Sequence, residues 1–351
     1  MVVKVGSSIL TGGGTSIVAE NLSRIVGHIA RLVKDKHDII LVTSGAIASG
    51  LSVLGFKKRP TQLSELQAAA AVGQNILMQA YNAELEKFGL KGAQILLTRE
   101  DFSERQRYLN ARNTINTLLE HNIIPIINEN DAISVEEIKF GDNDTLSARV
   151  AAAVEADGLV LLTDIDGLYK DFDSKTRTGI LLSAIEEITP EIEKLACGTD
   201  AASCVGGMST KIEAIKIAKE MGIPSICANG TSISLHINFD PASAHDGTLF
   251  AAKKSIGSKK HWIAFEAKTN GKIIVDDGAK KALVQHSRSL LSPGIVGVEG
   301  NFKAGDVVEI VDSAGTVFAK GKVNFSSHEL SQIKGKKAKD EAVHRDNLVV
   351  L

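Results

Sequence analysis

The alternation of apolar strands with amphipathic helices over residues 1–251 is the feature that most constrains the fold of this chain. The short runs 2–6, 38–45 and 158–164 are almost entirely apolar, whereas residues 16–35 repeat apolar side chains at the spacing of one helix face. Strands that are apolar on both faces are typical of parallel sheets covered by helices on both sides. We therefore predict an α/β domain, a three-layer αβα sandwich with a mostly parallel central sheet.

The same reading predicts the other elements of this region. They are helices at 61–88, 104–121, 143–156 and 209–222, and strands at 93–98, 122–131 and 223–229.

The pattern changes near residues 251–260, a polar segment rich in Gly, Ser and Lys that is typical of a linker. Short β-like runs follow, separated by glycines about every 8–12 residues, with one helical insertion at 279–285. This spacing indicates a small C-terminal β-barrel or sandwich. A length of 351 residues also suits two domains. We predict an α/β domain at 1–252 and a β-barrel domain at 261–351.

Composition and charge exclude several classes of protein. No apolar run approaches the ~18 residues that span a bilayer, and three cysteines without a C-x-x-C pair favour a reducing, cytoplasmic location over a disulfide scaffold. From residue 252 onward, 17 Lys and Arg face 11 Asp and Glu, a net charge of +6, which leaves −8 for residues 1–251. The basic tail fits either a nucleic-acid footprint or, more commonly, a lysine-rich solvated surface.

Polar and glycine-rich segments follow several of the predicted strands. They are Gly6-Ser7-Ser8, Ser44-Gly45-Ala46, the run 128–131 and Asp164. Because the carboxyl ends of parallel strands meet at one edge of a sheet, where ligands bind, we expect the site there. Taken singly, Gly6, Gly45 and Gly50 could be ordinary turn residues; together they favour backbone donors to an oxyanion. The loop of Gly12–Gly14 is expected to matter less.

Residues 127–153 concentrate amide and carboxylate side chains in two loops. These residue types are ordinary turn formers and helix caps, and either role is open to Asp142 and Asn143. Their number, however, favours a site for the ammonium group of a small zwitterion. The candidates are Asn128, Asp131, Asp142, Asn143 and Asp144.

Residues 203–214 place Gly206-Gly207 just before a predicted helix that begins with Ser209-Thr210-Lys211. Glycines permit close approach to a polyphosphate, and a helix N-terminus favours its negative charge. Phosphoryl transfer needs mainly positioning and neutralisation of charge. Lys4 and Lys211 fit that role from two sides, with Asp144 holding them by ion pairs and a magnesium ion assisting.

Seven motifs occur here in the order found in one group of kinases. They read VVKVGSSIL, VTSGAIASG, LNARNTI, IPIINENDA, FGDNDTLSA, LLTDIDGLY and GGMSTK, and they extend from residue 2 to residue 211. The sequence thus resembles the gamma-glutamyl kinases (glutamate 5-kinases), a branch of the amino-acid kinase family. The resemblance implies transfer of phosphate from ATP, with Mg2+, to L-glutamate, giving L-glutamyl 5-phosphate in the first step of proline biosynthesis.

The resemblance also implies roles for individual residues. Lys4, Lys211 and Asp144 would be catalytic. Glutamate would be bound by Ser44, Gly45, Asn128, Asp131, Asp142 and Asn143. The nucleotide would be bound by Lys4, Thr163, Asp164, Val205, Gly206, Gly207, Met208, Ser209, Thr210 and Lys211, with magnesium held mainly by the nucleotide. Feedback inhibition by proline and assembly into a homodimer or homotetramer are family traits that the resemblance carries with it.

The C-terminal region resembles a PUA domain, a small β-barrel known from RNA-modifying enzymes. The stretches IIVDDGAKKAL, SLLSPGIVGVEGNFKAGDVVEI and VHRDNLV carry this match. RNA binding is compatible with it but is not needed for kinase chemistry. Two residues depart from the usual patterns: Val205 replaces a threonine of the kinases, and Ser287 stands where PUA domains commonly have glycine.

Two alternatives stay open. One is a sister kinase that acts on another small carboxylate such as N-acetylglutamate, although Asp131 and Asn143 favour a free ammonium group. The other is an RNA-binding protein in which the kinase-like region is a regulatory module. The charged residues Lys4, Lys211 and Asp144 argue against it, because a retired site is expected to lose them.

Overall fold

The computed structural model describes residues 1–14, 16–134, 143–173, 178–197, 207–231, 237, 239–241, 246–252 and 257–351. They form two compact units. The first comprises Met1–Asp101 and Tyr108–Ser255, and the second Phe102–Arg107 and Ile256–Leu351. The segment Phe102–Arg107, expected in the first domain, groups with the second unit. The exact domain boundaries, 1–252 and 261–351, stay a prediction.

The first unit is built on an eight-stranded sheet in the order β3-β4-β2-β1-β5-β9-β10-β8. Neighbours from β3 to β9 pair in parallel, β10 runs antiparallel to β9, and β8 is parallel to β10. The strands are β1 (Val2–Val5), β2 (Ile40–Thr43), β3 (Lys91–Leu97), β4 (Ile123–Glu129), β5 (Leu159–Thr163), β8 (Ala184–Ile185), β9 (Ser225–Asn229) and β10 (Thr248–Phe250), and a separate hairpin joins β6 (Tyr169–Asp173) to β7 (Thr178–Leu181).

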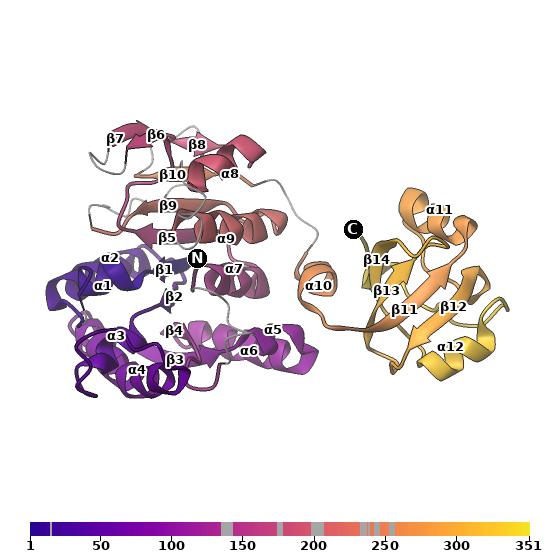
Figure 1. Ribbon diagram of the computed structural model, residues 1–351, viewed down its shortest axis with the longest axis horizontal. Coiled ribbons are helices and arrows are strands. Elements are labelled where there is room, and N and C mark those ends of the chain that lie inside the picture. Colours follow the sequence, from indigo (N-terminus) through magenta and orange to yellow (C-terminus); the bar gives the residue numbers. More distant parts are fainter. Residues whose placement is uncertain are drawn as a thin grey trace. The chain divides into compact units, whose positions relative to one another are not determined.

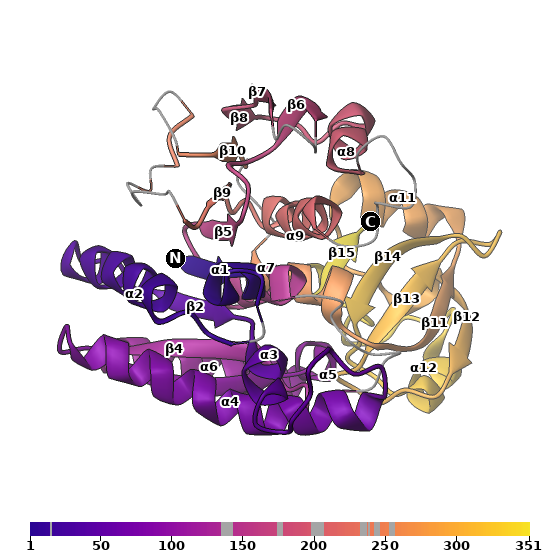
Figure 2. The same cartoon turned by 60° about the vertical axis from the view of Figure 1, so that its left-hand side comes forward.

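Helices cover both faces of this sheet, which confirms the predicted three-layer α/β architecture (Figures 1 and 2). One layer contains α1 (Ser7–Thr11), α2 (Ala19–Lys34), α3 (Ala46–Leu51) and α4 (Leu63–Glu86). The other contains α6 (Arg105–Glu120), α7 (Asn143–Val154) and α9 (Met208–Glu220), while α5 (Arg99–Ser103) precedes α6 and α8 (Pro190–Cys197) packs against α9.

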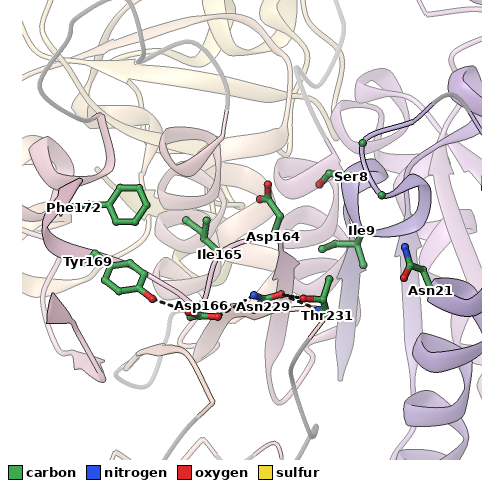
Figure 3. Close-up of a pocket in the computed structure, with 12 residues that line it drawn as sticks. Ser8, Ile9, Asn21, Asp164, Ile165, Asp166, Tyr169, Phe172, Asn229 and Thr231 are labelled. Carbon is green, nitrogen blue, oxygen red and sulfur yellow. Dashed lines mark hydrogen bonds between the residues drawn. The ribbon is translucent and has the colours of Figure 1, made fainter. Parts of the chain in front are cut away.

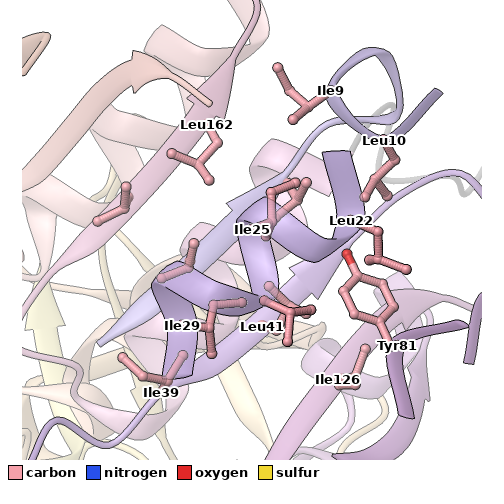
Figure 4. Close-up of a cluster of buried hydrophobic side chains, with 14 of the residues drawn as sticks. Ile9, Leu10, Leu22, Ile25, Ile29, Ile39, Leu41, Tyr81, Ile126 and Leu162 are labelled. Atoms are coloured by element: carbon pink, nitrogen blue, oxygen red, sulfur yellow. The ribbon is translucent and has the colours of Figure 1, made fainter. Parts of the chain in front are cut away.

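The core between the sheet and the first helical layer is entirely aliphatic apart from Tyr81 and Met78. Figure 4 shows Ile25 and Ile29 of α2 directed at Leu41 of β2, with Tyr81 of α4 beside them. Burying each such side chain stabilises the fold by roughly 1.5–3 kcal/mol. The Tyr81 hydroxyl is fully buried, and its hydrogen bond of 2.9 Å to Thr43 Oγ1 anchors the end of β2. Burial raises the pKa of Tyr81.

The second unit contains a five-stranded sheet in the order β12-β11-β13-β14-β15. Its strands are β11 (Thr269–Val275), β12 (Ile295–Gly300), β13 (Val307–Val311), β14 (Val317–Lys322) and β15 (Leu348–Val350), and its helices include α10 (Ser258–His261), a π-helix (Trp262–Glu266), α11 (Asp277–His286) and α12 (Ser327–Ile333). Only β11 and β13 pair in parallel. The expected β-rich domain with a helical insertion is therefore present, and α12 is an addition that the glycine spacing did not predict.

Ser287 gives a stability prediction for this unit. It ends α11 in the left-handed conformation, with φ 47° and ψ 41°, and its side chain is exposed. A residue with a Cβ in the left-handed conformation lowers stability by about 1–2 kcal/mol. Glycine avoids this cost, but its greater freedom in the unfolded chain offsets part of the gain. We expect Ser287→Gly to raise the free energy of unfolding by about 0.5 kcal/mol.

The check is denaturant unfolding of the full chain, followed by a probe in the second unit such as Trp262 fluorescence. Ser331→Gly serves as the control of opposite sign, because Ser331 lies inside α12, where glycine lowers stability by roughly 0.5–1 kcal/mol. A destabilising Ser287→Gly would contradict the strain argument.

Candidate active site

The site is built on adjacent parallel strands, β2, β1 and β5, with β4 beside β2. Lys4 lies on β1 between Val42 of β2 and Leu161 of β5. Alternation along the strand sends Val3 and Val5 into the core on one face. Lys4 therefore points to the opposite face, where α7 covers it.

A buried carboxylate joins two lysines from distant parts of the chain. Asp144, in the first turn of α7, is fully buried; its Oδ1 lies 2.5 Å from Lys4 Nζ and its Oδ2 lies 3.0 Å from Lys211 Nζ. Lys211 is in the first turn of α9, which packs beside α7 (Figure 1). The structure thus brings together the three residues that we predicted to be catalytic.

The environment keeps this carboxylate charged. Burial by itself would raise the pKa of Asp144, but the ammonium groups of Lys4 and Lys211, with their hydrogen bonds, lower it below its usual value. The cluster Lys4–Asp144–Lys211 therefore carries a net charge of +1 in a nearly dry environment. A charge in such a place interacts much more strongly with another charge than it would at the surface, because little solvent screens it. This excess positive charge is suited to stabilising a negatively charged group, above all one whose negative charge increases in the transition state.

The start of α9 supports Lys211. Gly207, with φ 87° and ψ −120°, adopts a backbone conformation that essentially only glycine tolerates. Its carbonyl accepts hydrogen bonds from Lys211 Nζ at 3.2 Å and from Thr210 Oγ1 at 3.0 Å. Thr210 Oγ1 also reaches Asp144 Oδ2 at 3.2 Å. Glycine at this position therefore fixes the approach of Lys211 to the carboxylate.

A second polar network follows β2 and β4. The two N–H groups of Asn143 Nδ2 face three acceptors: the Thr43 carbonyl at 2.7 Å, Ser44 Oγ at 2.9 Å and Asn128 Oδ1 at 2.8 Å. Asn143 Oδ1 is buried and has no hydrogen-bond partner in the part of the chain that the structure describes. Asn143 directly precedes Asp144, the carboxylate of the cationic cluster, at the start of α7. The structure thus brings Ser44, Asn128 and Asn143 together, as predicted.

Asp131 lies just beyond the end of β4 and lines a cavity of about 300 Å3. The other polar residues of this cavity are Gln74, Asn75, Gln94, Glu129 and Asn130, and Ala46, Ala70, Ala71, Leu96 and Ala132 complete its wall. Ala46 follows Ser44-Gly45 directly. The cavity therefore adjoins the β2 end of the polar network.

Gly45 and Gly50 have different roles from one another. Gly45 has φ 102° and caps the N-terminus of α3, so it needs the conformational freedom of glycine. Gly50 is inside α3, where an added Cβ would lie 2.0 Å from the carbonyl oxygen of Ala69 in α4. Grouping Gly50 with the oxyanion-binding glycines was wrong, because its place is in a close contact between two helices.

A larger cavity of about 480 Å3 lies beyond the carboxyl ends of β5 and β9 (Figure 3). Asp164, which follows β5, lines it, with Thr163 just before it on the strand. A chain of hydrogen bonds forms one wall: Tyr169 Oη donates to Asp166 Oδ2 at 2.8 Å, and Asn229 Nδ2 donates to Asp166 Oδ1 at 2.9 Å. The remaining lining residues are Ser8, Ile9, Gly12, Gly13, Asn21, Ile165, Phe172 and Thr231.

This cavity adjoins the cationic cluster. A Cβ added at Gly6 would lie 3.7 Å from Lys4 Nζ and 3.8 Å from Oγ of Ser8, a residue that lines the cavity. The thiol of Cys227, on β9, is buried. Burial raises the pKa of Cys227 to about 12, which keeps the thiol neutral.

Some predicted residues fall outside the described part of the chain, and others were missed. Asp142, Val205 and Gly206 lie outside the described residues, whereas Met208 and Ser209 lie in the first turn of α9. Gly12 and Gly13, expected to matter less, line the larger cavity. Asn229 was missed although it ends a predicted strand, so the rule that found Asp164 could also have found it.

The comparisons with known proteins agree with this geometry. A model of the amino acid kinase family matches residues 1–229, and a model of the PUA domain matches residues 271–343. The chain belongs to the amino acid kinase family. This amino acid kinase is 46% identical over its whole length to a protein named glutamate 5-kinase from Caldanaerobacter subterraneus, of which it covers 97%. It is 44% identical, with the same coverage, to the glutamate 5-kinase of Geobacter sulfurreducens.

Among solved structures, this amino acid kinase resembles the carbamate kinase of Giardia lamblia bound to AMP-PNP. The TM-score is 0.51 at 18% identity, and the match covers 72% of this chain and 98% of that one. At that identity the likeness concerns the fold alone. In the parts of the chain that are described, no helix is long and apolar enough to cross a membrane.

Proposed function

We propose that this amino acid kinase transfers the γ-phosphoryl group of ATP to the side-chain carboxylate of L-glutamate, giving L-glutamyl 5-phosphate and ADP in the first step of proline biosynthesis. The buried cluster Lys4–Asp144–Lys211 carries the proposal, since it is suited to phosphoryl transfer. Full-length relatives named glutamate 5-kinase support the choice of acceptor.

The reaction needs no protein nucleophile. A carboxylate oxygen of glutamate attacks the γ-phosphorus, the new O–P bond forms, and the bond from that phosphorus to the β,γ-bridging oxygen breaks with release of ADP. The acceptor is already ionised at neutral pH, so no general base is required. What remains is in-line positioning and neutralisation of charge on the transferring group, the terms that dominate this chemistry.

Each lysine has a distinct part in that task. Lys4 extends from β1, between the ends of β2 and β5, and Lys211 approaches from the first turn of α9. Both ammonium groups are about nine-tenths buried. We assign to the ammonium groups of Lys4 and Lys211 the neutralisation of negative charge on the equatorial and bridging oxygens of the transferring phosphoryl group. Asp144 holds them at a fixed spacing and leaves one positive charge in excess.

The larger cavity is the proposed nucleotide site. Its volume of about 480 Å3 suits a nucleotide, and it opens beside Asp164 at the end of β5. Within the described residues, no group of three His, Cys, Asp or Glu side chains could hold a metal ion. We propose that a magnesium ion is carried mainly by the nucleotide phosphates, where it would offset their charge.

The polar residues beyond β2 and β4 are the proposed glutamate site. Asn143 Oδ1 is a buried acceptor without a partner among the described residues, and Asp131 adds a carboxylate in the adjoining cavity. An ammonium group supplies donors for Asn143 Oδ1 and a positive charge opposite Asp131, whereas the acetylated amine of N-acetylglutamate has a single N–H and no charge. Homo-oligomerisation, inhibition by proline and RNA binding stay predictions.

A direct assay tests the proposal. Purified protein is incubated with ATP, Mg2+ and either L-glutamate or N-acetyl-L-glutamate, and ADP release and acyl phosphate, trapped as the hydroxamate, are measured. We expect kcat/KM to favour L-glutamate by at least about 100-fold, because the acetylated amine carries no positive charge to interact with Asp131. Equal use of both compounds, or preference for the acetylated one, would overturn the assignment.

A further inference from the structure

The amide network beside the cationic cluster ends in a buried donor that the proposed reaction has not yet used. The network consists of Asn143, Asn128 and Gln74, a residue of α4. Each carboxamide has one end that only donates and one that only accepts, so the orientation of one amide dictates that of the next. Two backbone groups fix the direction of the whole chain.

The first fixed point is the Thr43 carbonyl, which can only accept. It lies 2.7 Å from Asn143 Nδ2 and so determines which end of that amide faces it. The second is the Glu129 backbone N–H, which can only donate, and does so to Asn128 Oδ1 at 2.9 Å. Asn128 Nδ2 must then face an acceptor, and Gln74 Oε1 meets it at 2.8 Å. By elimination the free end of Gln74 is its Nε2 donor.

This donor is enclosed and unpaired. Gln74 is 8% exposed, and its Nε2 atom is buried without a hydrogen-bond partner among the described residues. A buried donor without a partner is costly and therefore uncommon in native structures. Gln74 cannot relieve the cost by turning its amide, because Asn128 Nδ2 would then face a second donor. Among the described residues, the donor therefore stays available to a further acceptor.

The surroundings indicate what that acceptor is. Gln74 lines the cavity of about 300 Å3 that also contains Asp131, with the amides of Asn75 and Gln94 on its wall. A cavity that combines carboxylates with amide donors suits a zwitterion, whose ammonium group meets the former and whose carboxylate meets the latter. A ligand with only a neutral carbonyl would make no use of the negative charge of Asp131 in this cavity.

We infer that Gln74 Nε2 donates a hydrogen bond to the carboxylate of the amino-acid substrate that is not phosphorylated. This inference rests on the proposed function. The reacting carboxylate must lie beside Lys4 and Lys211, whereas Gln74 is at the far end of the Asn143–Asn128–Gln74 chain. Glutamate has its second carboxylate at the opposite end from the first. Gln74 is thus a specificity-determining residue that selects a dicarboxylic amino acid over a monocarboxylic one.

Gln74→Glu is the most informative variant. The glutamate side chain keeps an oxygen to accept from Asn128 Nδ2, so the amide network survives, but it replaces the donor by a negative charge. We expect KM for L-glutamate to rise about tenfold or more, the usual loss for a hydrogen bond to a charged group, while KM for ATP stays unchanged. Gln74→Met removes the donor without adding charge, together with the acceptor of Asn128 Nδ2, and it should also raise KM for L-glutamate without changing KM for ATP.

Two analogues identify the interaction that is lost. Glutarate lacks the ammonium group and 4-aminobutyrate lacks the second carboxylate, and each is measured as a competitive inhibitor against L-glutamate. Gln74→Glu should weaken glutarate at least as much as it weakens glutamate, and it should not weaken 4-aminobutyrate, because the added negative charge attracts an ammonium group. Gln79→Glu is the matched control, since Gln79 is an exposed residue of the same helix outside the cavity; it should change none of these values.

The outcomes are distinct. If the variants weaken 4-aminobutyrate rather than glutarate, Gln74 acts on the ammonium end through Asn143 and the inference is wrong. It is also wrong if the wild-type enzyme phosphorylates glutamate and Gln74→Glu leaves KM for glutamate unchanged. Absence of glutamate phosphorylation by the wild-type protein would instead overturn the proposed function itself.

Discussion

Replacing Lys211 by alanine is expected to lower kcat for ATP-dependent glutamate phosphorylation by about 10^3-fold, the usual loss when one preorganised transition-state donor is removed. Lys211 Nζ is 3.0 Å from Asp144 Oδ2, and the ion pair is shielded from solvent. Without it the cluster loses its excess positive charge, because Lys4 and Asp144 then neutralise each other. KM for glutamate should change much less, since Asn143 and Asp131 are untouched. Steady-state kinetics with ADP detection gives both values.

Lys216→Ala is the matched control. Lys216 is on the same helix, but its ion pair with Glu193, 2.6 Å long, is about half exposed on both sides. Exposed ion pairs contribute about 0–1 kcal/mol to stability, and Lys216 has no part in the proposed reaction. Its removal should leave kcat within about twofold of the wild type. If Lys211→Ala retained wild-type kcat, the proposed mechanism would be wrong.

Gly73→Ala is expected to destabilise the first unit by about 3 kcal/mol, near the upper end for an overpacked core. Gly73 is buried in α4, and an added Cβ would lie 1.8 Å from the carbonyl oxygen of Ala46 and 2.5 Å from the backbone nitrogen of Gly50, both in α3. These are backbone atoms, so no rotamer change relieves the clash and the two helices must separate. The free energy of unfolding from urea titration measures the effect.

The consequence should reach the active site. Helix α3 begins at Ala46, directly after Ser44-Gly45, so moving it displaces Ser44 from Asn143. We therefore expect the surviving folded fraction to show a raised KM for glutamate. Gly27→Ala is the control: Gly27 is inside α2, where a Cβ would make only an ordinary contact, 3.8 Å from a Phe88 ring atom. It should be neutral or stabilising by up to about 1 kcal/mol. A similar effect of both substitutions would refute the close-packing argument.

Much of the fold could be predicted because its signals are local. The apolar run 38–45 and the helical period of 16–35 correspond to β2 (Ile40–Thr43) and α2 (Ala19–Lys34). Parallel strands buried on both faces must be nearly continuous apolar runs, so they are readable without any partner. Short elements such as α3 and β8 were not predicted, because six or two residues carry too little periodicity.

The candidate site was predicted in part for the same reason. Residues at the carboxyl ends of parallel strands share one edge, which is why Ser44, Asn128 and Asp164 could be grouped in advance. Gly50 was misplaced because the sequence cannot distinguish a glycine that turns the chain from one that lets two helices touch. Gln74 gave no signal at all, since a glutamine within a helix is ordinarily a solvent-exposed residue.

By itself, the sequence determined which segments become strands and helices, which edge of the sheet is polar, and, through its motifs, which family of kinases it resembles. The tertiary structure alone decided which charges meet: Lys4, Asp144 and Lys211 are separated by up to 207 positions yet share one carboxylate. It also decided the direction of the Asn143–Asn128–Gln74 chain. Hydrophobic periodicity is a local property of the chain, whereas ion pairs and amide orientations depend on atoms that only folding brings within 3 Å.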